Sequence, residues 1–417
     1  MAEFLKLVAP LEALKALMQA LPDLSAEEEL VDVLGAIGRV TARDVRAPHA
    51  LPSFSRSSMD GFAVRAVDTY GASESIPGYL AIAGEVPMGA EPDFALQPGQ
   101  AALIHTGGML PRNADAVIMV EQTEQSRNGE ISILKGVAPG ENIILMGEDV
   151  QEGQIVIQGG IRVRPAEVGG CMALGITQLR IAKKPRIGIL SSGDEVIAPE
   201  REPAAGQVRN VNSYSLAALV REAGGEPVLY GIVPDKLELM KERASKALSE
   251  CQAVVITAGS SASARDMTAE VIASLGDPGV LVHGVNVRPG KPTILAVCNG
   301  KAVIGLPGNP VSALVIASLF VVPVIKKLLG EKADRPRKAC MARLNLNIPS
   351  QAGREDWIAV KLTASVEQND EEDAWLAAPI FSKSNLIFSL VAADGLIRIP
   401  PDATGLEAGE QVQVFLF

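Results

Sequence analysis

Six short segments of the chain combine glycine, proline, hydroxyl and charged residues in patterns that suit anion and metal binding. They are residues 57–61 (SSMDG), 106–108 (TGG), 147–149 (GED), 192–195 (SGDE), 288–292 (RPGKP) and 305–310 (GLPGNP). Glycine lets a backbone approach a phosphate closely, proline fixes that approach, and carboxylates can hold a metal that neutralises phosphate charge. The segments together predict one site for an anion and a metal.

Composition limits the classes of protein to consider. At 417 residues the chain exceeds one ordinary hydrophobic core, so several domains are expected. With 38 basic and 49 acidic residues, a net charge of −11 and no basic stripe, we expect no nucleic-acid partner. The four cysteines lie far apart and the three histidines are isolated, which argues against a disulfide framework, a zinc finger or an iron–sulfur cluster.

Neither a secretory signal nor a membrane span is predicted. Residues 1–21 form an amphipathic helical pattern with interspersed charges rather than a charged cap followed by an unbroken apolar run. The longest apolar stretch, residues 313–325, is shorter than the roughly 20 residues that a span requires, and it contains Pro323. We interpret it as a buried core helix in a cytoplasmic protein that does not bind membranes.

The elements that must position these segments are clearest from residue 185 to residue 331. Apolar strand patterns alternate with amphipathic helices, which predicts an α/β domain of three layers with a mostly parallel sheet. The predicted strands are 186–190, 227–233, 253–257, 280–287 and a hairpin of 294–297 with 302–304 that turns at Asn299-Gly300; the predicted helices are 213–222, 236–249, 267–275 and 310–329.

Each chemistry-bearing loop of this domain follows a predicted strand. Open α/β sheets bind ligands beyond the carboxyl ends of their strands, so Glu195, Asp235, Asp266 and Lys291 are expected at one edge. Taken singly, each loop could be an ordinary turn in which glycine and proline serve only the backbone conformation. Their shared edge favours a common site.

The segment before the last long helix is a candidate phosphate site. Asn309 suits a helix cap, Pro310 suits the first helical position, and the free N–H groups that follow could face an anion. Arg288 and Lys291 flank Pro289-Gly290 and so place two cations on a stiff loop. We therefore predict an anion near both segments.

Shorter β-like runs occupy the rest of the chain. Residues 50–136 are rich in glycine and proline, with strand patterns at 101–105 and 116–120, and predict a β-rich lobe. After residue 335, alternating patterns at 341–346, 357–362 and 410–416 predict a small C-terminal β domain.

In this order the six segments resemble the molybdopterin molybdenumtransferase family, which inserts molybdenum into its pterin cofactor and includes the E domain of gephyrin. The most specific string is residues 56–64, RSSMDGFAV. The resemblance covers nearly the whole chain. It implies an α/β plus β protein of four domains. These are a discontinuous linker domain (1–48 and 144–184), a β-rich lobe (49–143), a three-layer α/β molybdopterin-binding domain (185–331) and a small C-terminal β-barrel-like domain (332–417). In the linker domain the first helix is expected to pack with the second segment.

The resemblance also implies an activity, a transferase that inserts molybdate or tungstate into adenylylated molybdopterin and releases AMP. Mg²⁺ would be the cofactor, held by Glu195, Asp235 and Asp266, and each site would be shared across a homodimer. The implied catalytic residues are Asp60, Thr106, Asp149, Glu195, Asp235, Asp266 and Lys291. The implied substrate-binding residues are Ser192, Gly193, Gly259, Ser261, Arg288, Gly290, Pro307, Gly308, Asn309, Ser312, Arg354 and Ser384.

Several positions depart from the family pattern. Ala258 and Ser263 replace two glycines of the family's Ser-Gly-Gly-Val-Ser-x-Gly-x-x-Asp loop, which stands here as residues 257–266, and these side chains project where a ligand or backbone would approach. The other departures are Ile144 and Gly284 where the family has cations, Asn210 where it has Asp, and Asn385 where it has Gly. They indicate a weakened or redirected site.

Two alternatives to the transferase stay open. One is a degenerate paralogue that holds the pterin cofactor for a partner enzyme without metal transfer. The other is a nucleotide pyrophosphatase that uses a related α/β domain. Release of AMP from the adenylylated pterin distinguishes the transferase from the degenerate paralogue. Turnover of simple dinucleotides would reveal the pyrophosphatase. The choice between molybdenum and tungsten is also open.

Overall fold

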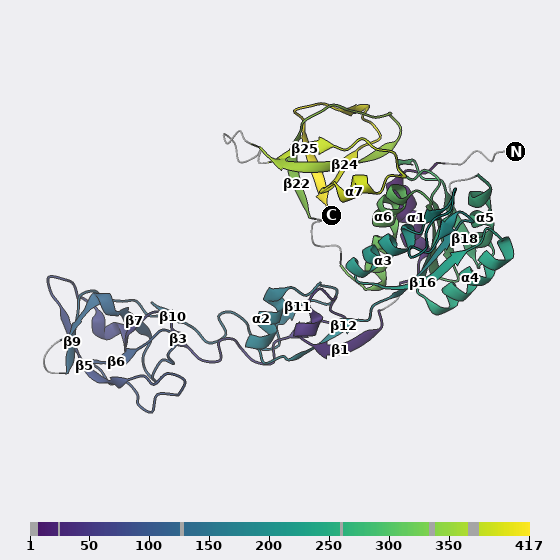
Figure 1. The fold of residues 1–417 in the computed structure, drawn as a ribbon. Helices are drawn as coiled ribbons and strands as arrows, with labels where there is room; N and C mark the ends of the chain where they lie inside the picture. Colours follow the sequence, from purple (N-terminus) through teal and green to yellow (C-terminus); the bar gives the residue numbers. More distant parts are fainter. Residues whose placement is uncertain (1–6, 24–25, 126–128, 259–261, 333–337, 366–374) are drawn as a thin grey trace.

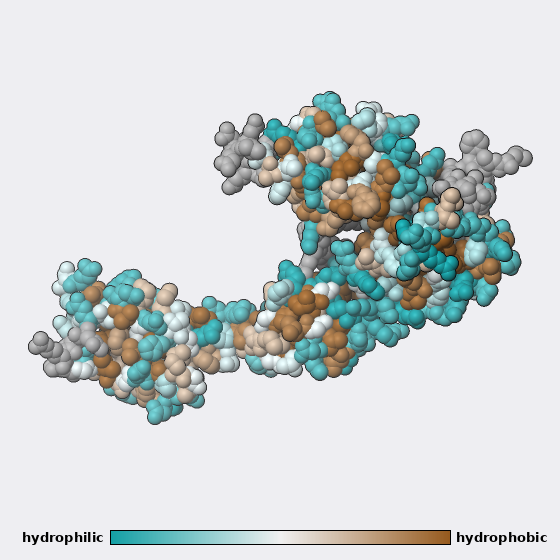
Figure 2. Space-filling view, viewed as in Figure 1, coloured by the Kyte–Doolittle hydropathy of each residue, from teal (hydrophilic) through white to brown (hydrophobic). Residues whose placement is uncertain are grey.

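The computed structural model describes residues 7–23, 26–125, 129–258, 262–332, 338–365 and 375–417. Four packed units follow one another in space (Figure 1). A β-rich lobe lies at one end, a linker unit in the middle, and an α/β unit and a small barrel at the other end. The space-filling view in Figure 2 shows the same extended outline, narrowing between the lobe and the linker unit. The domain boundaries given above stay a prediction.

The α/β unit is built on one six-stranded sheet. Its order is β16-β13-β17-β21-β20-β18. The pairings among the first four strands are parallel, and β20 pairs antiparallel with both β21 and β18. The strands are β13 (Arg186–Ser192), β16 (Glu226–Val233), β17 (Ala253–Ala258), β18 (Pro278–His283), β20 (Ile294–Cys298) and β21 (Lys301–Pro307), with a short parallel pair, β14 (Val196–Ile197) and β15 (Val208–Arg209), beside them.

Helices cover both faces of this sheet and confirm the three layers. Helices α1, α3 and α6 share one hydrophobic core with one face, and α4 and α5 share a second core with the other. The helices are α1 (Pro10–Ala20), α3 (Asn212–Glu222), α4 (Leu237–Glu250), α5 (Ala262–Ala273) and α6 (Pro310–Leu328). Because both faces are covered, β17 is buried along its whole length, as its unbroken apolar sequence predicts.

The predicted hairpin is confirmed. It connects β20 to β21 through Asn299 and Gly300, both of which have positive φ (52° and 76°). Both central residues of a type I′ turn require that backbone region, and Asn-Gly satisfies it without strain. The turn starts β21 at Lys301, so β21 ends at Pro307 beside the carboxyl end of β17.

Helix α6 is the central helix of the α/β unit. By length and apolar composition it could cross a membrane. However, Ile316, Phe320 and Ile325 are fully buried, and α3, β21 and α1 pack against it. The prediction of a buried core helix for residues 313–325 is therefore confirmed.

Helix α1 packs elsewhere than the family resemblance implied. We expected the first helix to pack with residues 144–184, but Ala13 and Leu17 are buried against α6 and β20 of the α/β unit. The helix has its apolar residues at positions 13 and 17, one turn apart, and α6 offers the larger apolar surface for that stripe.

Helix α5 begins earlier than predicted. The sequence prediction treated residues 257–266 as a loop and started the helix at Met267, but the helix already includes Ala262 to Asp266. Ser263, which replaces a glycine of the family loop, is a better helix former than glycine, and Ala262 and Ala264 on either side are among the best, so this sequence favours helix over an open phosphate loop.

The linker unit is formed by two separate stretches of chain. Strand β1 (Glu28–Asp32) pairs with β12 (Gln178–Ala182), and β2 (Val45–Arg46) pairs with β11 (Ile155–Ile157). The short helix η1 (Leu34–Ala36) and helix α2 (Pro165–Ala173) complete it, and Val33, Ile157 and Ile181 lie in the common core.

The β-rich lobe is inserted between these stretches. Its sheet has the order β7-β4-β6-β5-β9-β8, and a separate pair joins β10 to β3. The elements are β3 (Arg56–Ser57), β4 (Gly61–Val64), η2 (Ala66–Thr69), β5 (Gly78–Glu85), β6 (Gln100–Ile104), β7 (Ala116–Met119), η3 (Val120–Gln122), β8 (Thr123–Gln125), β9 (Glu130–Ile133) and β10 (Ile143–Ile144).

The C-terminal unit is a closed five-stranded barrel, as predicted. The ring runs β24-β25-β22-β28-β26 and returns to β24. Its elements are β22 (Ala339–Leu344), β23 (Ile348–Pro349), β24 (Glu355–Ala364), β25 (Trp375–Pro379), α7 (Phe388–Val391), β26 (Gly395–Ile399), β27 (Gly405–Leu406) and β28 (Gln411–Leu416). Strand β19 (Val287–Arg288) of the α/β unit pairs in parallel with β24 and so anchors the barrel.

Candidate functional site

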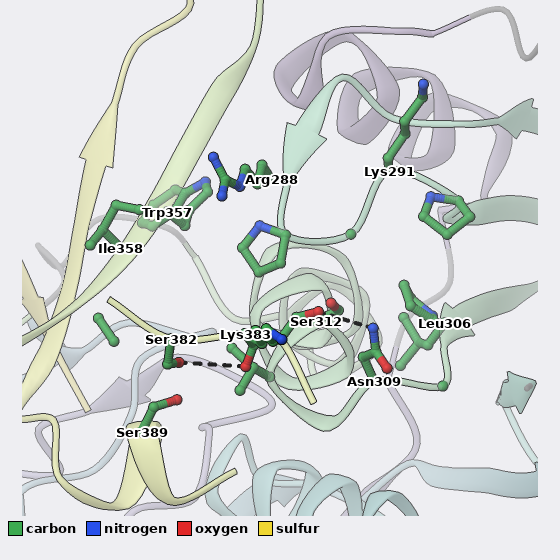
Figure 3. Close-up of a pocket in the computed structure, with 18 of the residues that line it drawn as sticks. Arg288, Lys291, Leu306, Asn309, Ser312, Trp357, Ile358, Ser382, Lys383 and Ser389 are labelled. Atoms are coloured by element: carbon green, nitrogen blue, oxygen red, sulfur yellow. Dashed lines mark hydrogen bonds between the residues drawn. The ribbon is translucent and has the colours of Figure 1, made fainter. Parts of the chain in front are cut away.

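A cavity of about 620 Å³ lies where the barrel meets the α/β unit (Figure 3). We call it the seam cavity. The α/β unit contributes the loop 288–292, the end of β21 and the start of α6, while the barrel contributes Trp357, Phe381 and Ser389. The predicted site residues that line it are Arg288, Gly290, Lys291, Pro307, Gly308, Asn309, Ser312 and Ser384.

The loop from Arg288 to Pro292 is held rigidly. Arg288 lies on β19, which is paired with the barrel. Gly290 has a φ of +120°, and a side chain there would collide with Ile316 of α6. The Thr293 hydroxyl donates to the Gly290 carbonyl at 2.6 Å. Glycine is therefore required by close packing on α6, and the loop presents its cations on a fixed backbone.

The start of α6 is occupied by the barrel. The backbone N–H of Val311 donates to the Ser384 carbonyl at 3.1 Å, and Asn309 Nδ2 donates to Ser384 Oγ at 2.9 Å. The Asn309 side chain makes no capping hydrogen bond to the helix. The expectation that free N–H groups here face an anion is therefore wrong for Val311, because the Ser384 carbonyl supplies that acceptor.

Arg354 lies outside the lining of the seam cavity. Its guanidinium forms two hydrogen bonds to fully buried Asp356, at 2.6 and 3.0 Å, and the Ser350 hydroxyl donates to the same carboxylate. Arg288 lies 3.9 Å from Asp356. A bidentate pair of this kind satisfies the guanidinium, so Arg354 supports the wall of the cavity rather than offering a free cation.

A second cavity of about 340 Å³ lies at the carboxyl ends of β13 and β17. We call it the strand-end hollow. Its lining includes Ser192, Glu195 and Asn210, and it shares Ala258, Gly308 and Asn309 with the seam cavity. The two cavities therefore adjoin at these shared residues, and the Ala258 side chain lies at their boundary.

Gly193 is required by the geometry of the strand-end hollow. It has a φ of +141°, and a Cβ there would lie 2.7 Å from a Glu195 carboxylate oxygen. The predicted role of Gly193 therefore has a structural basis, because it lets the Glu195 carboxylate fold back against the loop.

Asp235 follows β16 at the same edge and lies near two other acids. Burial and the charges of Asp194 and Glu195 raise the pKa of Asp235 above its usual value. Among the described residues, neither the buried Asp235 Oδ1 nor the nearby Ser192 hydroxyl makes a hydrogen bond of normal geometry, although Ser192 lies close enough to oppose the rise in the pKa of Asp235. Burial and the neighbouring acids therefore disfavour the ionised form of Asp235.

The predicted metal ligands are only partly brought together. In the part of the chain that the structure describes, no group of three His, Cys, Asp or Glu side chains is arranged to hold a metal ion. Asp266 is an exposed residue of α5 and does not join Glu195 and Asp235 in such a group. Gly259 and Ser261 lie outside the described residues.

Asp60 and Thr106 form a separate group on the β-rich lobe. The backbone N–H and the hydroxyl of Thr106 both donate to Asp60 Oδ1, at 2.7 and 2.9 Å. The Thr106 backbone N–H, then its hydroxyl, lower the pKa of the Asp60 carboxyl. His105 Nδ1 lies 3.8 Å from the same oxygen. Asp60 is thus presented as an exposed, ionised group.

The third acid of that region stands apart. Asp149 is exposed in a turn, and its backbone N–H donates to the Leu51 carbonyl. Among the described residues, its side chain makes no hydrogen bond or ion pair with Asp60 or Thr106. In Figure 1 the linker unit separates the whole lobe from the α/β unit and the barrel of the same chain, whose residues line the seam cavity. One chain therefore does not bring Asp60 and Thr106 to Lys291.

Sequence reasoning assigned no role to three residues of these sites. Lys383 lines the seam cavity, Asp194 lies beside Asp235, and Asn212 Nδ2 donates to the Gly308 carbonyl at 2.7 Å. Asp194 belongs to the segment 192–195 and Lys383 directly precedes Ser384, so adjacency along the chain was a usable signal. Asn212 lies two residues after Asn210, one of the departures from the family pattern, so its place in that stretch was a signal too.

Family models match most of the chain. Residues 8–175 match the MoeA N-terminal region (domain I and II), residues 188–327 match a probable molybdopterin binding domain, and residues 341–417 match the MoeA C-terminal region (domain IV).

Two curated relatives carry the name molybdopterin molybdenumtransferase. The one from Nostoc sp. is 33% identical over 94% of this chain and 89% of its own length, and the one from Bacillus subtilis is 32% identical over 94% and 90%. The solved structure of a molybdopterin biosynthesis MoeA protein from Pyrococcus horikoshii superposes with a TM-score of 0.84 at 33% identity, covering 99% of this chain and all of the other. This chain therefore belongs to the MoeA family of molybdopterin molybdenumtransferases, which act in molybdenum cofactor biosynthesis.

Proposed function

We propose that this protein inserts molybdenum, supplied as molybdate, or tungsten, supplied as tungstate, into adenylylated molybdopterin and releases AMP. The observation that carries the proposal is the pair of adjoining cavities. Cationic and hydroxyl side chains line the seam cavity. Ser192 and Glu195 line the strand-end hollow, and Asp235 lies beside these two residues. A substrate with phosphates between two ring systems needs such an elongated, chemically divided site.

The protein's contribution is mainly positioning. In the seam cavity Arg288 and Lys291 would bind phosphate or metal oxyanion, and the apolar wall with Trp357 and Phe381 would contact a flat ring. The dithiolene sulfurs would displace oxo ligands of the oxyanion, which leave with protons as water, while a separate water molecule cleaves the pyrophosphate bond to give AMP and the pterin phosphate. No covalent enzyme intermediate is required.

Mg²⁺ fits the acid group at the end of β16. The buried Asp235 oxygen, which makes no hydrogen bond of normal geometry to the described residues, and the raised pKa of that carboxyl indicate that a cation is favoured beside Asp194 and Glu195. When bound, Mg²⁺ would supply Lewis-acid polarisation of a phosphate oxygen. We assign Asp235 and Glu195 as its ligands, while the position of Asp266 on α5 gives that residue no supported role as a ligand.

We further propose a homodimer in the cytoplasm. The exposed Asp60–Thr106 pair has no partner group in its own chain near the seam cavity, and a second subunit could supply one. All four cysteines are free thiols, which fits a reducing compartment.

The test is turnover by the purified protein. Adenylylated molybdopterin, Mg²⁺ and either oxyanion are mixed, and AMP is followed over time. We expect AMP release that depends on the oxyanion and falls by roughly 10²-fold in Asp60→Asn, as loss of a charged site group commonly does. Asp402→Asn, an exposed acid of the barrel, is the control. No AMP from the wild-type protein would contradict the proposal.

A second function is favoured by one observation. Ala258 stands where the family has glycine and lines both cavities, and we infer that its methyl group lies where a ligand spanning both would pass. A protein that binds the pterin cofactor for a partner without metal transfer would tolerate this obstruction. Tight binding of molybdopterin combined with no AMP release would identify that carrier.

A further inference from the structure

The seam cavity is strongly biased toward anions. Among the described residues that line it, none is acidic, whereas Arg288, Lys291 and Lys383 are cationic. Ser312, Ser382, Ser384 and Ser389 add hydroxyl groups. A cavity with these walls favours a ligand with several exposed oxygens and negative charge.

The backbone at the start of α6 does not supply the first contacts to such an anion. The Val311 N–H is already bonded to the Ser384 carbonyl, and Pro310 has no N–H. Side-chain cations must therefore provide much of the attraction on this side of the cavity.

The three cations differ in how they are placed. Arg288 lies 3.9 Å from buried Asp356, whose charge competes with a ligand. In Figure 3 the amino group of Lys291 points away from Asn309, while Lys383 is drawn in the same part of the cavity as Asn309 and Ser312. Lys383 directly precedes Ser384, the residue bonded to Asn309. It is exposed, and within the described parts of the chain it has no ion-pair partner.

We propose that Lys383, supplied by the barrel, is a substrate-binding cation that holds a tetrahedral oxyanion against Asn309 and Ser312. This rests on the proposed function and assigns one more residue to its site. The oxyanion is a phosphate group of the pterin nucleotide or the metal oxyanion, which share this chemistry. Because the cation comes from the barrel and the remaining contacts from the α/β unit, anion binding and docking of the barrel support each other.

The test is calorimetric binding to the full-length protein at low salt, with AMP and molybdate as separate probes. We expect Lys383→Ala to weaken binding of at least one probe by about tenfold, the effect of losing one charged hydrogen bond. Lys383→Arg should retain most of the affinity because it keeps the charge. The control is Lys361→Ala, an exposed lysine of β24 outside the cavity lining.

The probes separate the two sources of the oxyanion. Loss of AMP affinity alone assigns Lys383 to a substrate phosphate, loss of molybdate affinity alone assigns it to the metal oxyanion, and loss of both indicates a shared position. Wild-type affinity of Lys383→Ala for both probes, equal loss in Lys361→Ala, or no binding of either probe by the wild-type protein would overturn the proposal. The wild-type protein could instead bind the probes through Lys383 and yet release no AMP. That result would overturn the proposed transferase activity and leave the assignment of Lys383 as an anion-binding residue intact.

Discussion

Local environment gives the acidic residues of this protein different states. Asp60 receives two hydrogen bonds from Thr106 and has a lowered pKa, whereas burial and neighbouring acids raise the pKa of Asp235. The Thr106 hydrogen bonds stabilise ionised Asp60 without a cation. Ionised Asp235 would instead be stabilised by a nearby cation. Their chemical roles therefore differ although both residues are aspartates.

Asp235→Asn should make the protein more stable in the absence of Mg²⁺. The raised pKa means that the folded state disfavours ionised Asp235, so this group costs stability at neutral pH and the cost disappears as the pH falls through the folded pKa. We expect the melting temperature at pH 7.5 to rise by on the order of 2 °C. Mg²⁺ should then stabilise the wild-type protein but not the variant. Equal responses to Mg²⁺ would rule out Asp235 as a ligand, and Asp402→Asn serves as control.

Ala258→Gly should improve ligand binding. The substitution removes the methyl group at the boundary of the two cavities, at a cost of about 0.5–1 kcal/mol of stability for glycine in a strand. We expect tighter binding of adenylylated molybdopterin and unchanged affinity for AMP alone. Ala296→Gly, a buried alanine of β20 outside both cavities, controls for the loss of stability. Unchanged binding of the pterin would show that the methyl does not face the ligand.

Loops gain their geometry from the elements on which they pack. The loop 288–292 is fixed between β19, which joins the barrel, and α6, which lies against Gly290. Helix α2 shows the same dependence on its first turn, where Glu167 accepts the Arg164 backbone N–H and pairs with the Arg164 guanidinium. In both cases a few contacts at the end of an element determine its position.

Gly290→Ala should disturb the cation loop. The added methyl would collide with Ile316 and would require a backbone conformation that L-residues rarely adopt. We expect a loss of 1–3 kcal/mol in the free energy of unfolding, a typical range for overpacking, and weaker anion binding. Gly353→Ala is the matched control, since it also has a positive φ (+87°) but open space around it. Equal effects of the two substitutions would show that backbone strain alone is responsible.

Glu167→Gln should weaken α2 in a pH-dependent way. Hydrogen bonds from Arg164 lower the pKa of Glu167 from 4.5 to about 2. Its contribution to stability is therefore present above pH 4.5 and is lost as the pH falls toward about 2. Urea unfolding should show a deficit of about 1 kcal/mol at pH 7 that shrinks below pH 4. Glu152→Gln, an exposed acid of the linker unit, should show no such change, and a deficit independent of pH would refute the ion pair.

The whole molecule is extended because the linker unit separates the β-rich lobe from the α/β unit and the barrel, which line the cavities. Arg162 connects the linker unit to the α/β unit: it pairs with Glu331 at 2.6 Å and donates to the carbonyls of Gly38 and Ala223. This contact supports the linker at the C-terminal ends of α3 and α6. The lobe is thus held away from its own seam cavity and is available to a second subunit.

Subunit complementation tests this arrangement. If each site combines Asp60 of one subunit with Lys291 of the other, a heterodimer of Asp60→Asn and Lys291→Ala contains one site with neither change. Heterodimers purified through two different tags should recover about half of the wild-type rate of AMP release, although each parent is inactive. A monomer with full activity in sedimentation, or no recovery in the heterodimer, would contradict a shared site.

The sequence by itself determined the features that depend on near neighbours. Periodicity predicted the strands and helices of the α/β unit, Asn299-Gly300 predicted the hairpin turn, and the order of the six segments indicated the family. These patterns are local, because helix and strand periods and turn preferences involve residues only a few positions apart.

The tertiary structure alone decided which partners the site residues have. Asp356 satisfies Arg354, the Ser384 carbonyl occupies the Val311 N–H, and α1 packs on α6. The packing of the units also places Lys383 at the seam cavity and keeps Asp60 far from Lys291. Each outcome depends on which surfaces of the folded units meet. No local period in the sequence encodes that choice, because the contacting residues come from distant parts of the chain and compete with other partners for the same surface.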